Sequence, residues 1–337
     1  MTTLVARAPG KLFLLGEYAV LDGAPAIVAA VDRFIEVRLT PRTVRTVRIT
    51  APGVGEALDF DPGRPPPYAP LRFVLAAYGH AIAVCPRLAT AGLELDISGD
   101  LDAHRSAAKL GLGSSAAVTV ATTAALFAAA GVEAAARGLQ DAVFSAAFRA
   151  HRAAQGEIGS GADVAASTFG GLVLFEPRPQ ALPRTTALSL PPWAILLAAS
   201  TGESAATEPL VRQYQAIERT RRTAFVRLSR GAVAWFATSM RQQAVSLTAL
   251  DAAGNALAQL ADSCGLPLFS ARLQALIAIA RAHGAAAKPS GAGGGDCGIA
   301  LTTNAASAKR IRTAWREAGL VPLDLCISGE GVTVGVA

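Results

Sequence analysis

The sequence has few charged residues and few cysteines, and each scarcity argues against particular classes of protein. Only 17% of its 337 residues are charged, and the net charge of +6 is mild. With 52% hydrophobic residues, this balance favours a large buried core and a basic pocket for small anions over a nucleic-acid-binding surface. The cysteines show no CxxC spacing, which argues against a disulfide scaffold and a zinc site, so we expect a reducing, cytoplasmic compartment. They are Cys85, Cys264, Cys297 and Cys326.

Signal and membrane-spanning segments are not predicted either. The apolar run at residues 12–15 is too short for a signal-peptide core. Residues 110–132 carry no charge, but this stretch begins with Gly and Ser and continues mainly with Ala and Thr, which predicts a buried helix. An arginine-rich stretch at residues 219–230 fits a solvated or anion-facing helix surface. We therefore predict neither a membrane partner nor a nucleic-acid partner.

Lysine is rare in this sequence, which has four lysines and 27 arginines. Three of them, Lys11, Lys109 and Lys288, lie in or beside glycine-rich stretches. An ammonium group is a compact and mobile cation that suits contacts with phosphate oxygens. The placement of these lysines therefore indicates a site for phosphate groups.

The glycine-rich stretch at residues 109–117 (KLGLGSSAA) leads into a predicted helix over residues 118–130. Its glycines can adopt positive φ, and the first N–H groups of the helix favour an anion. Ser114 and Ser115 can cap the helix, contact phosphate or hold a metal. The stretch matches neither GxxxxGK[ST] nor GxGxxG, so a plain glycine turn with a serine cap stays open at this point.

Two further stretches carry candidate polar groups. In residues 7–18 (RAPGKLFLLGEY) we predict a turn at Pro9–Gly10 that places Lys11 at the start of a strand. In residues 155–171 (QGEIGSGADVAASTFGG) the glycines lead Asp163 to the first residues of a short helix, where the helix dipole favours an ionised carboxylate. A helix-capping role and a reactive role both remain possible for this aspartate.

The last dense motif spans residues 287–297 (AKPSGAGGGDC), where glycine amides can close around an anion. The pattern along the whole chain predicts an α+β fold of two domains, with the proline-rich residues 176–192 as the linker. Helices are predicted over residues 71–84, 138–155, 164–168, 208–250 with a break near Gly231, 252–264, 270–283 and 304–318. Strands are predicted over residues 4–8, 26–31, 34–40, 44–50, 93–98, 171–175, 193–199, 298–301, 321–327 and 332–336.

Three of these motifs together resemble the GHMP kinase superfamily of small-molecule kinases, which use ATP and Mg²⁺. The matching stretches are residues 8–18, 110–116 and 290–297, in the order typical of the superfamily. The resemblance implies an N-terminal ATP-binding domain similar to domain 2 of ribosomal protein S5, over residues 1–185. It also implies a ferredoxin-like C-terminal domain over residues 186–337, with the active site between the two domains.

Within the superfamily, residues 150–166 and 288–298 are most similar to the phosphomevalonate kinases. That resemblance implies transfer of the ATP γ-phosphate to the phosphate of 5-phosphomevalonate by a monomer or homodimer. Mevalonate kinases carry a magnesium-binding glutamate near the position of His151, so the sequence departs from them there. A mevalonate kinase, a diphosphomevalonate decarboxylase and a non-catalytic ligand sensor of the same fold remain the alternatives.

The resemblance also assigns roles to single residues. Lys11 and Asp163 are expected to face each other as the catalytic pair. Because a phosphate acceptor is already mostly ionised at neutral pH, Asp163 is expected to orient groups more than to remove a proton. Glu157 is a weaker metal candidate than the two serines. Expected ATP contacts are Lys109, Gly111, Leu112, Gly113, Ser114, Ser115 and Ala116, with Ser114 or Ser115 on Mg²⁺. Expected acceptor contacts are Lys11, Tyr18, Ser160, Gly161, Lys288, Ser290, Gly291, Ala292, Gly293 and Gly294, with Arg105, Arg152 or Arg212 on a substrate carboxylate.

Overall fold

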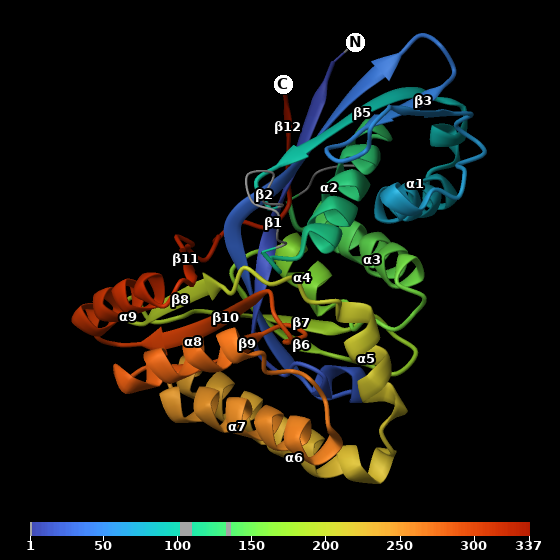
Figure 1. Cartoon of the computed structure of the whole chain (residues 1–337). Coiled ribbons are helices and arrows are strands. Elements are labelled where there is room, and N and C mark those ends of the chain that lie inside the picture. The colour runs from blue at the N-terminus through green and yellow to red at the C-terminus, as the bar shows by residue number, and fades with distance from the viewer. Residues whose placement is uncertain (1, 102–109, 133–135) are drawn as a thin grey trace.

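The computed structural model describes residues 2–101, 110–132 and 136–337 (Figure 1). Within these ranges the chain forms an eight-stranded sheet and a four-stranded sheet, each with helices packed against it. The predicted α+β fold of two domains is confirmed. The cysteines are all unpaired, as expected from their spacing.

The larger sheet is built around one long antiparallel pair, β1 and β2. The strand order is β12-β1-β2-β5-β3-β4, and β6 pairs with β2 and β7. Every pairing is antiparallel except that of β3 with β5. The strands are β1 (Leu4–Leu15), β2 (Ala26–Arg42), β3 (Val47–Thr50), β4 (Leu58–Phe60), β5 (Gly92–Gly99), β6 (Leu172–Glu176), β7 (Arg184–Leu188) and β12 (Thr333–Val336).

The turn predicted at Pro9–Gly10 is wrong, because β1 runs through both residues. The register with β2 shifts between Pro9 and Gly10, an irregularity that accommodates a proline without an N–H group. Just after the shift, the amide of Lys11 donates to the carbonyl of Leu112, 2.7 Å away. Lys11 therefore lies within a long strand, at the point where that strand contacts the glycine-rich loop.

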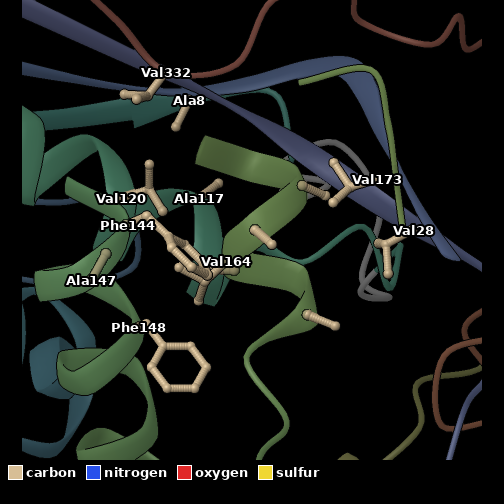
Figure 2. Packing of buried hydrophobic residues seen from close by; sticks show 14 of the residues in the cluster. Ala8, Val28, Ala117, Val120, Phe144, Ala147, Phe148, Val164, Val173 and Val332 are labelled. Atoms are coloured by element: carbon tan, nitrogen blue, oxygen red, sulfur yellow. The ribbon is translucent and has the colours of Figure 1, made fainter. Parts of the chain in front are cut away.

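Two helices, α2 (Ser114–Ala129) and α4 (Ala162–Phe169), pack directly on the larger sheet, and α1 (Arg72–Val84) and α3 (Ala136–Ala154) pack against α2. The uncharged stretch of the sequence is α2, and buried Thr119 and Thr123 each donate to the carbonyl one turn earlier, at 2.7 and 2.8 Å. Figure 2 shows Val164 of α4 among Ala117 and Val120 of α2 and Phe144 of α3. In the part of the chain that the structure describes, no helix is long and apolar enough to cross a membrane.

The smaller sheet is antiparallel, with strand order β11-β8-β10-β9. In chain order this is 4-1-3-2, the ferredoxin-like arrangement. Its strands are β8 (Ile195–Ser200), β9 (Ala286–Ser290), β10 (Cys297–Thr302) and β11 (Val321–Leu323). The helices of this half are α5 (Thr207–Ala216), α6 (Arg219–Arg241), α7 (Leu247–Cys264), α8 (Ala271–Ala282) and α9 (Ala305–Glu317).

The helix break expected in this half is wrong. The helical segment does not break at Gly231, which lies inside α6; it breaks at residues 217–218 and again at 242–246. A glycine costs a helix only about 1 kcal/mol, and the packing of α6 on α7 outweighs it. The predicted linker contains β7, which pairs with β6, and β12 returns to the larger sheet. The domain boundary at residue 185 stays a prediction.

Candidate active site

A cavity of about 420 Å³ lies where the glycine-rich stretches meet. It is lined by β1 and the residues after it, by the start of α2, by the loop before α4, by the start of α5 and by the loop between β9 and β10. Lys11 and Asp163, expected as the catalytic pair, both line it. Other predicted residues in its wall are Tyr18, Gly111, Leu112, Gly113, Ser114, Ser115, Ser160, Ser290, Gly291 and Ala292.

The loop before α2 has the geometry of an anion-binding loop. Gly111 and Gly113 have φ of 71° and 81°, which a glycine adopts without strain. A Cβ atom at Gly113 would lie 2.8 Å from the side chain of Lys11, and one at Gly111 would lie 2.7 Å from Cβ of Asp296. Ala116 and Ala117 donate the first amide bonds of the helix, to the carbonyl of Gly113. The amides of the two serines precede those bonds, at the positive end of the helix dipole.

Lys11 is tied to this loop through both its backbone and its side chain. Its ammonium donates to the carbonyl of Gly111 at 2.9 Å, in addition to the backbone bond with Leu112. The side chain is largely buried, with 8% of the residue exposed. The loop therefore holds the ammonium at the edge of the cavity, where it can contact a phosphate group without a large rearrangement.

Asp163 lies in the first turn of α4, as predicted. Gly161 caps the helix with φ of 76°, and a Cβ atom there would collide with the ring of Phe148, so the turn requires glycine. Asp163 Oδ1 accepts from the amide of Val164 at 3.0 Å. Lys11 and Asp163 line the same cavity, but among the described residues they form no direct ion pair. Both residues therefore border the cavity in which reacting groups can bind.

His151 connects Asp163 to the glycine-rich loop. Its Nε2 lies 3.3 Å from Ser115 Oγ and 3.8 Å from Asp163 Oδ2, and its ring stacks on Phe73 with centroids 5.1 Å apart. Burial lowers the pKa of His151, Lys11 and Arg72 lower it further, and Asp163 opposes them. The lowered pKa favours the neutral imidazole at neutral pH. Since Nδ1 is buried without a hydrogen-bond partner, we assign the proton to Nε2, where it faces Ser115 and Asp163.

Protein stability is expected to fall in mild acid because of His151. Its pKa in the folded state is lowered from 6.5, so the unfolded chain binds this proton more readily. The stabilising contribution is present above pH 6.5 and is lost as pH falls below it, by up to about 1.4 kcal/mol per pH unit. Urea unfolding at pH 7.5, 6.5 and 5.5 measures it. The His151→Gln variant should show a shallower decline, and equal declines in both proteins would contradict the assignment.

The serine hydroxyl groups of the cavity suit a magnesium ion that arrives with a nucleotide. The described residues contain no group of three or more His, Cys, Asp or Glu side chains arranged to hold a metal. Mg²⁺ takes most ligands from water and substrate phosphates and needs only one or two protein oxygens. The hydroxyl groups of Ser114 and Ser115, beside a loop that admits only glycine at Gly111 and Gly113, meet that need.

The loop between β9 and β10 is divided between the cavity and the protein core. Ser290 donates to the carbonyl of Phe13 at 3.1 Å, which joins the loop to β1. The amide of Gly294 bonds the carbonyl of Leu268 at 2.8 Å, and a Cβ atom at Gly293 would lie 2.5 Å from the same carbonyl. The structure therefore brings the first part of the loop to the cavity and packs Gly293 and Gly294 against the segment before α8.

Lys288 does not reach the cavity. Its ammonium is buried and forms an ion pair with Glu17, and it also donates to the carbonyl of Pro289 at 2.7 Å. Burial lowers the pKa of Lys288, and the charge of Glu17 opposes that shift. Glu17 follows β1 and lines the cavity, whereas Lys288 lies on β9. The pair therefore joins the two sheets next to the cavity, and Lys288 is a structural partner of Glu17 in this arrangement.

Several other predicted residues lie elsewhere. Lys109 and Arg105 fall outside the described residues. Glu157 is bound to Arg152 at 3.1 Å, and neither lines this cavity. Arg212 forms an exposed ion pair with Glu208 on α5. The other predicted residues outside the cavity lining are Gly161, which caps α4, and Ala116, which is buried in α2.

Sequence reasoning missed several residues of the cavity wall. Arg72 and Phe73 begin α1 and belong to no motif, so no pattern marked them. Asp296 lines the cavity and accepts from the amide of Ala205 at 2.9 Å. The three glycines before Asp296 could have marked it as a residue of the cavity wall. The start of α5 also contributes, through Thr207, Glu208, Pro209 and Val211.

Comparison with known proteins shows which family the chain resembles. The GHMP kinases N terminal domain matches residues 72–171, and the GHMP kinases C terminal domain matches residues 242–320. Phosphomevalonate kinase of Streptomyces sp. (strain CL190) is 36% identical over 98% of both chains. Mevalonate kinase of Pyrococcus furiosus is 29% identical, also over 98% of both chains.

A solved structure supports the same fold. Streptococcus pneumoniae phosphomevalonate kinase, in complex with phosphomevalonate and AMPPNP, superposes with a TM-score of 0.81. The match covers 96% of this chain and 99% of that chain at 22% identity, so it bears on the fold alone. These findings agree with the sequence motifs. Both domains of the family match in order, one relative is more than 30% identical along nearly the whole chain, and the fold is shared. The chain therefore belongs to the GHMP kinase family and is an ATP-dependent kinase.

Proposed function

We propose that this kinase is a phosphomevalonate kinase, which transfers the γ-phosphate of ATP to the phosphate of 5-phosphomevalonate. The products are ADP and 5-diphosphomevalonate. The observation that carries the proposal is the 36% identity to a phosphomevalonate kinase along nearly the whole chain. Mevalonate kinases match at lower identity. Both kinds of relative support a kinase of the mevalonate pathway, whereas the choice of 5-phosphomevalonate as the acceptor rests on the higher identity to the phosphomevalonate kinase.

The polar groups of the cavity suit a phosphate acceptor. A phosphate monoester has a second pKa near 6 and is mostly a dianion at neutral pH, so it needs little help from a base. Asp163 is held by the amide of Val164 and faces the neutral imidazole of His151. In this role the carboxylate orients the acceptor and the ammonium of Lys11, and it takes up no proton.

Repulsion between two polyanions is the main barrier that the protein has to lower. An oxygen of the acceptor phosphate forms a bond to the γ-phosphorus, and the bond from that phosphorus to the β,γ-bridging oxygen breaks, which leaves ADP. Lys11 and the first amides of α2 can stabilise the charge that develops on the transferring group. When bound with ATP, Mg²⁺ supplies further neutralisation of the phosphate charges.

The direct test compares 5-phosphomevalonate with mevalonate as the acceptor under MgATP, with ADP release as the readout. We expect kcat/KM for 5-phosphomevalonate to be larger by at least about 100-fold, because each missing charge contact costs about 2–3 kcal/mol. ³¹P NMR identifies a diphosphate product. Preference for mevalonate would make the chain a mevalonate kinase. Carbon dioxide release would indicate a decarboxylase, and nucleotide binding without turnover would indicate a ligand sensor.

A further inference from the structure

A cluster of three side chains, Asp22, Tyr214 and Arg222, lies just outside the cavity lining. The hydroxyl of Tyr214 on α5 donates to Asp22 Oδ2 at 2.5 Å. Nη1 of Arg222 on α6 donates to both oxygens of the same carboxylate, at 2.9 and 3.0 Å. Asp22 ends the short 3₁₀ helix η1 (Ala19–Asp22) that follows β1. The cluster therefore joins the larger sheet to two helices of the other half.

The cluster is well shielded from solvent. Tyr214 is fully buried, and the side chains of Arg222 and Asp22 are 13% and 21% exposed. The guanidinium of Arg222 also lies over the Tyr214 ring, 5.1 Å from its centroid. Burial raises the pKa of Tyr214, and the hydrogen bond to Asp22 raises it further, so the hydroxyl stays protonated and remains a donor. Charge-assisted bonds with this little solvent access are stronger than surface ion pairs.

The cluster acts on the cavity through Tyr18. The rings of Tyr18 and Tyr214 pack with centroids 5.1 Å apart, and the hydroxyl of Tyr18 donates to the carbonyl of Ala292 at 2.5 Å. Tyr18 has φ of 59°, a conformation that a non-glycine residue keeps only where its surroundings hold it. Tyr18 and Ala292 both line the cavity, and Tyr214 does not. Tyr214 therefore supports Tyr18, a residue with a strained backbone in the cavity wall, from the side away from the cavity.

The wall held in this way is formed by other segments than the glycine-rich loop before α2. Phe73 stacks on His151, which contacts Ser115, so the start of α1 belongs with the loop that suits ATP phosphates. Tyr18 instead belongs to a hydrophobic cluster with residues of α5, α6 and α7, and Val211 of α5 is a member of the same cluster and also lines the cavity. The wall formed by Tyr18 and the start of α5 is therefore available to the second substrate.

We propose that Asp22, Tyr214 and Arg222 are positioning residues for the acceptor substrate, because they hold Tyr18 and α5 in the wall that binds the acceptor. None of them lines the cavity, and none forms a hydrogen bond or ion pair with the described residues of the glycine-rich loop before α2. The proposal rests on the proposed function only for the identity of the acceptor, 5-phosphomevalonate. Its signature is a change in the KM of the acceptor that is separate from kcat and from the KM of ATP.

The test uses two variants that preserve side-chain shape, Asp22→Asn and Tyr214→Phe. Asp22→Asn removes the charge that both partners contact, and we expect the KM of the acceptor to rise about tenfold. Tyr214→Phe removes one hydroxyl and keeps the ring against Tyr18, so a rise of about threefold is expected. In both variants kcat and the KM of ATP should stay within about twofold of the wild type. The matched control is Asp251→Asn, which breaks an ion pair with Arg281 between α7 and α8, away from the cavity.

The outcomes separate this proposal from the proposed function. The wild type is measured first, and whichever acceptor it phosphorylates is used for the variants, so preference for mevalonate would refute only the proposed function. An unchanged acceptor KM in folded Asp22→Asn would refute the positioning role, and so would an equal rise in the KM of ATP. Circular dichroism reports folding, and if Asp22→Asn does not fold, Tyr214→Phe decides by the same criterion.

Discussion

Lys11→Met is expected to lower kcat by about 10³-fold, which corresponds to about 4 kcal/mol of lost transition-state stabilisation. Methionine replaces the apolar part of the lysine side chain and removes the ammonium. Among the described residues that line the cavity, Lys11 and Arg72 are the only lysine or arginine side chains, against four carboxylates. The ammonium is also held in place by the carbonyl of Gly111. Its loss therefore leaves Arg72 as the one lysine or arginine side chain among the described residues that line the cavity.

Steady-state ADP release measures this loss, and Lys309→Met is the matched control. Lys309 is exposed on α9, so the same substitution there should leave kcat unchanged. Thermal unfolding of Lys11→Met should stay close to that of the wild type, because the carbonyl of Gly111 can hydrogen-bond to water in the cavity. A folded Lys11→Met protein with near-normal turnover would refute the assignment of the catalytic cation.

Glu17→Gln is expected to destabilise the protein by about 3 kcal/mol, since it leaves a buried ammonium without its counter-ion. Lys288 is 1% exposed and its ion pair with Glu17 joins β9 to the end of β1. The unpaired lysine has to give up its proton or draw water inside, and either costs free energy. Urea unfolding at pH 7.5 measures the change.

A double-mutant cycle isolates the contribution of the pair. Lys288→Met combined with Glu17→Gln removes both charges, so the double variant should be more stable than the two single losses added together would predict. The surface control is Glu36→Gln, which breaks partly exposed ion pairs with Arg7 and Arg38 and should cost less than about 0.5 kcal/mol. A Glu17→Gln protein that unfolds at the wild-type urea concentration would show that the pair does not hold the two sheets together.

The glycine loops and the helix starts beside them were predictable because their requirements are local. Positive φ at Gly113 and Gly161, and a carboxylate in the first turn of α4, follow from residues close together in the chain. The same local logic failed at Pro9–Gly10, where pairing with β2 and the bond to Leu112 keep the chain extended. A turn signal is outweighed there by contacts with distant residues.

The roles of single side chains were harder to predict because they depend on distant partners. Lys288 lies in a glycine-rich motif that suits a phosphate contact, yet its partner Glu17 is 271 residues away in the sequence and buries it. Arg72 reaches the cavity because α1 packs beside α2, which no short pattern records. His151 was noted only for its departure from a family pattern. Its contacts with Ser115 and Asp163 required the packing of α3 against α2 and α4.

The return of β12 to the larger sheet has a consequence for folding during synthesis. β12 covers the outer side of β1 over Leu4 to Arg7, and buried Val332 just before it packs in the same core. The ribosome makes β1 first and β12 last, so β1 has an unpaired edge while residues 16–332 are being synthesised. An exposed strand edge is a template for pairing with other chains. Nascent chains that stop before β12 are therefore expected to be the species most dependent on chaperones.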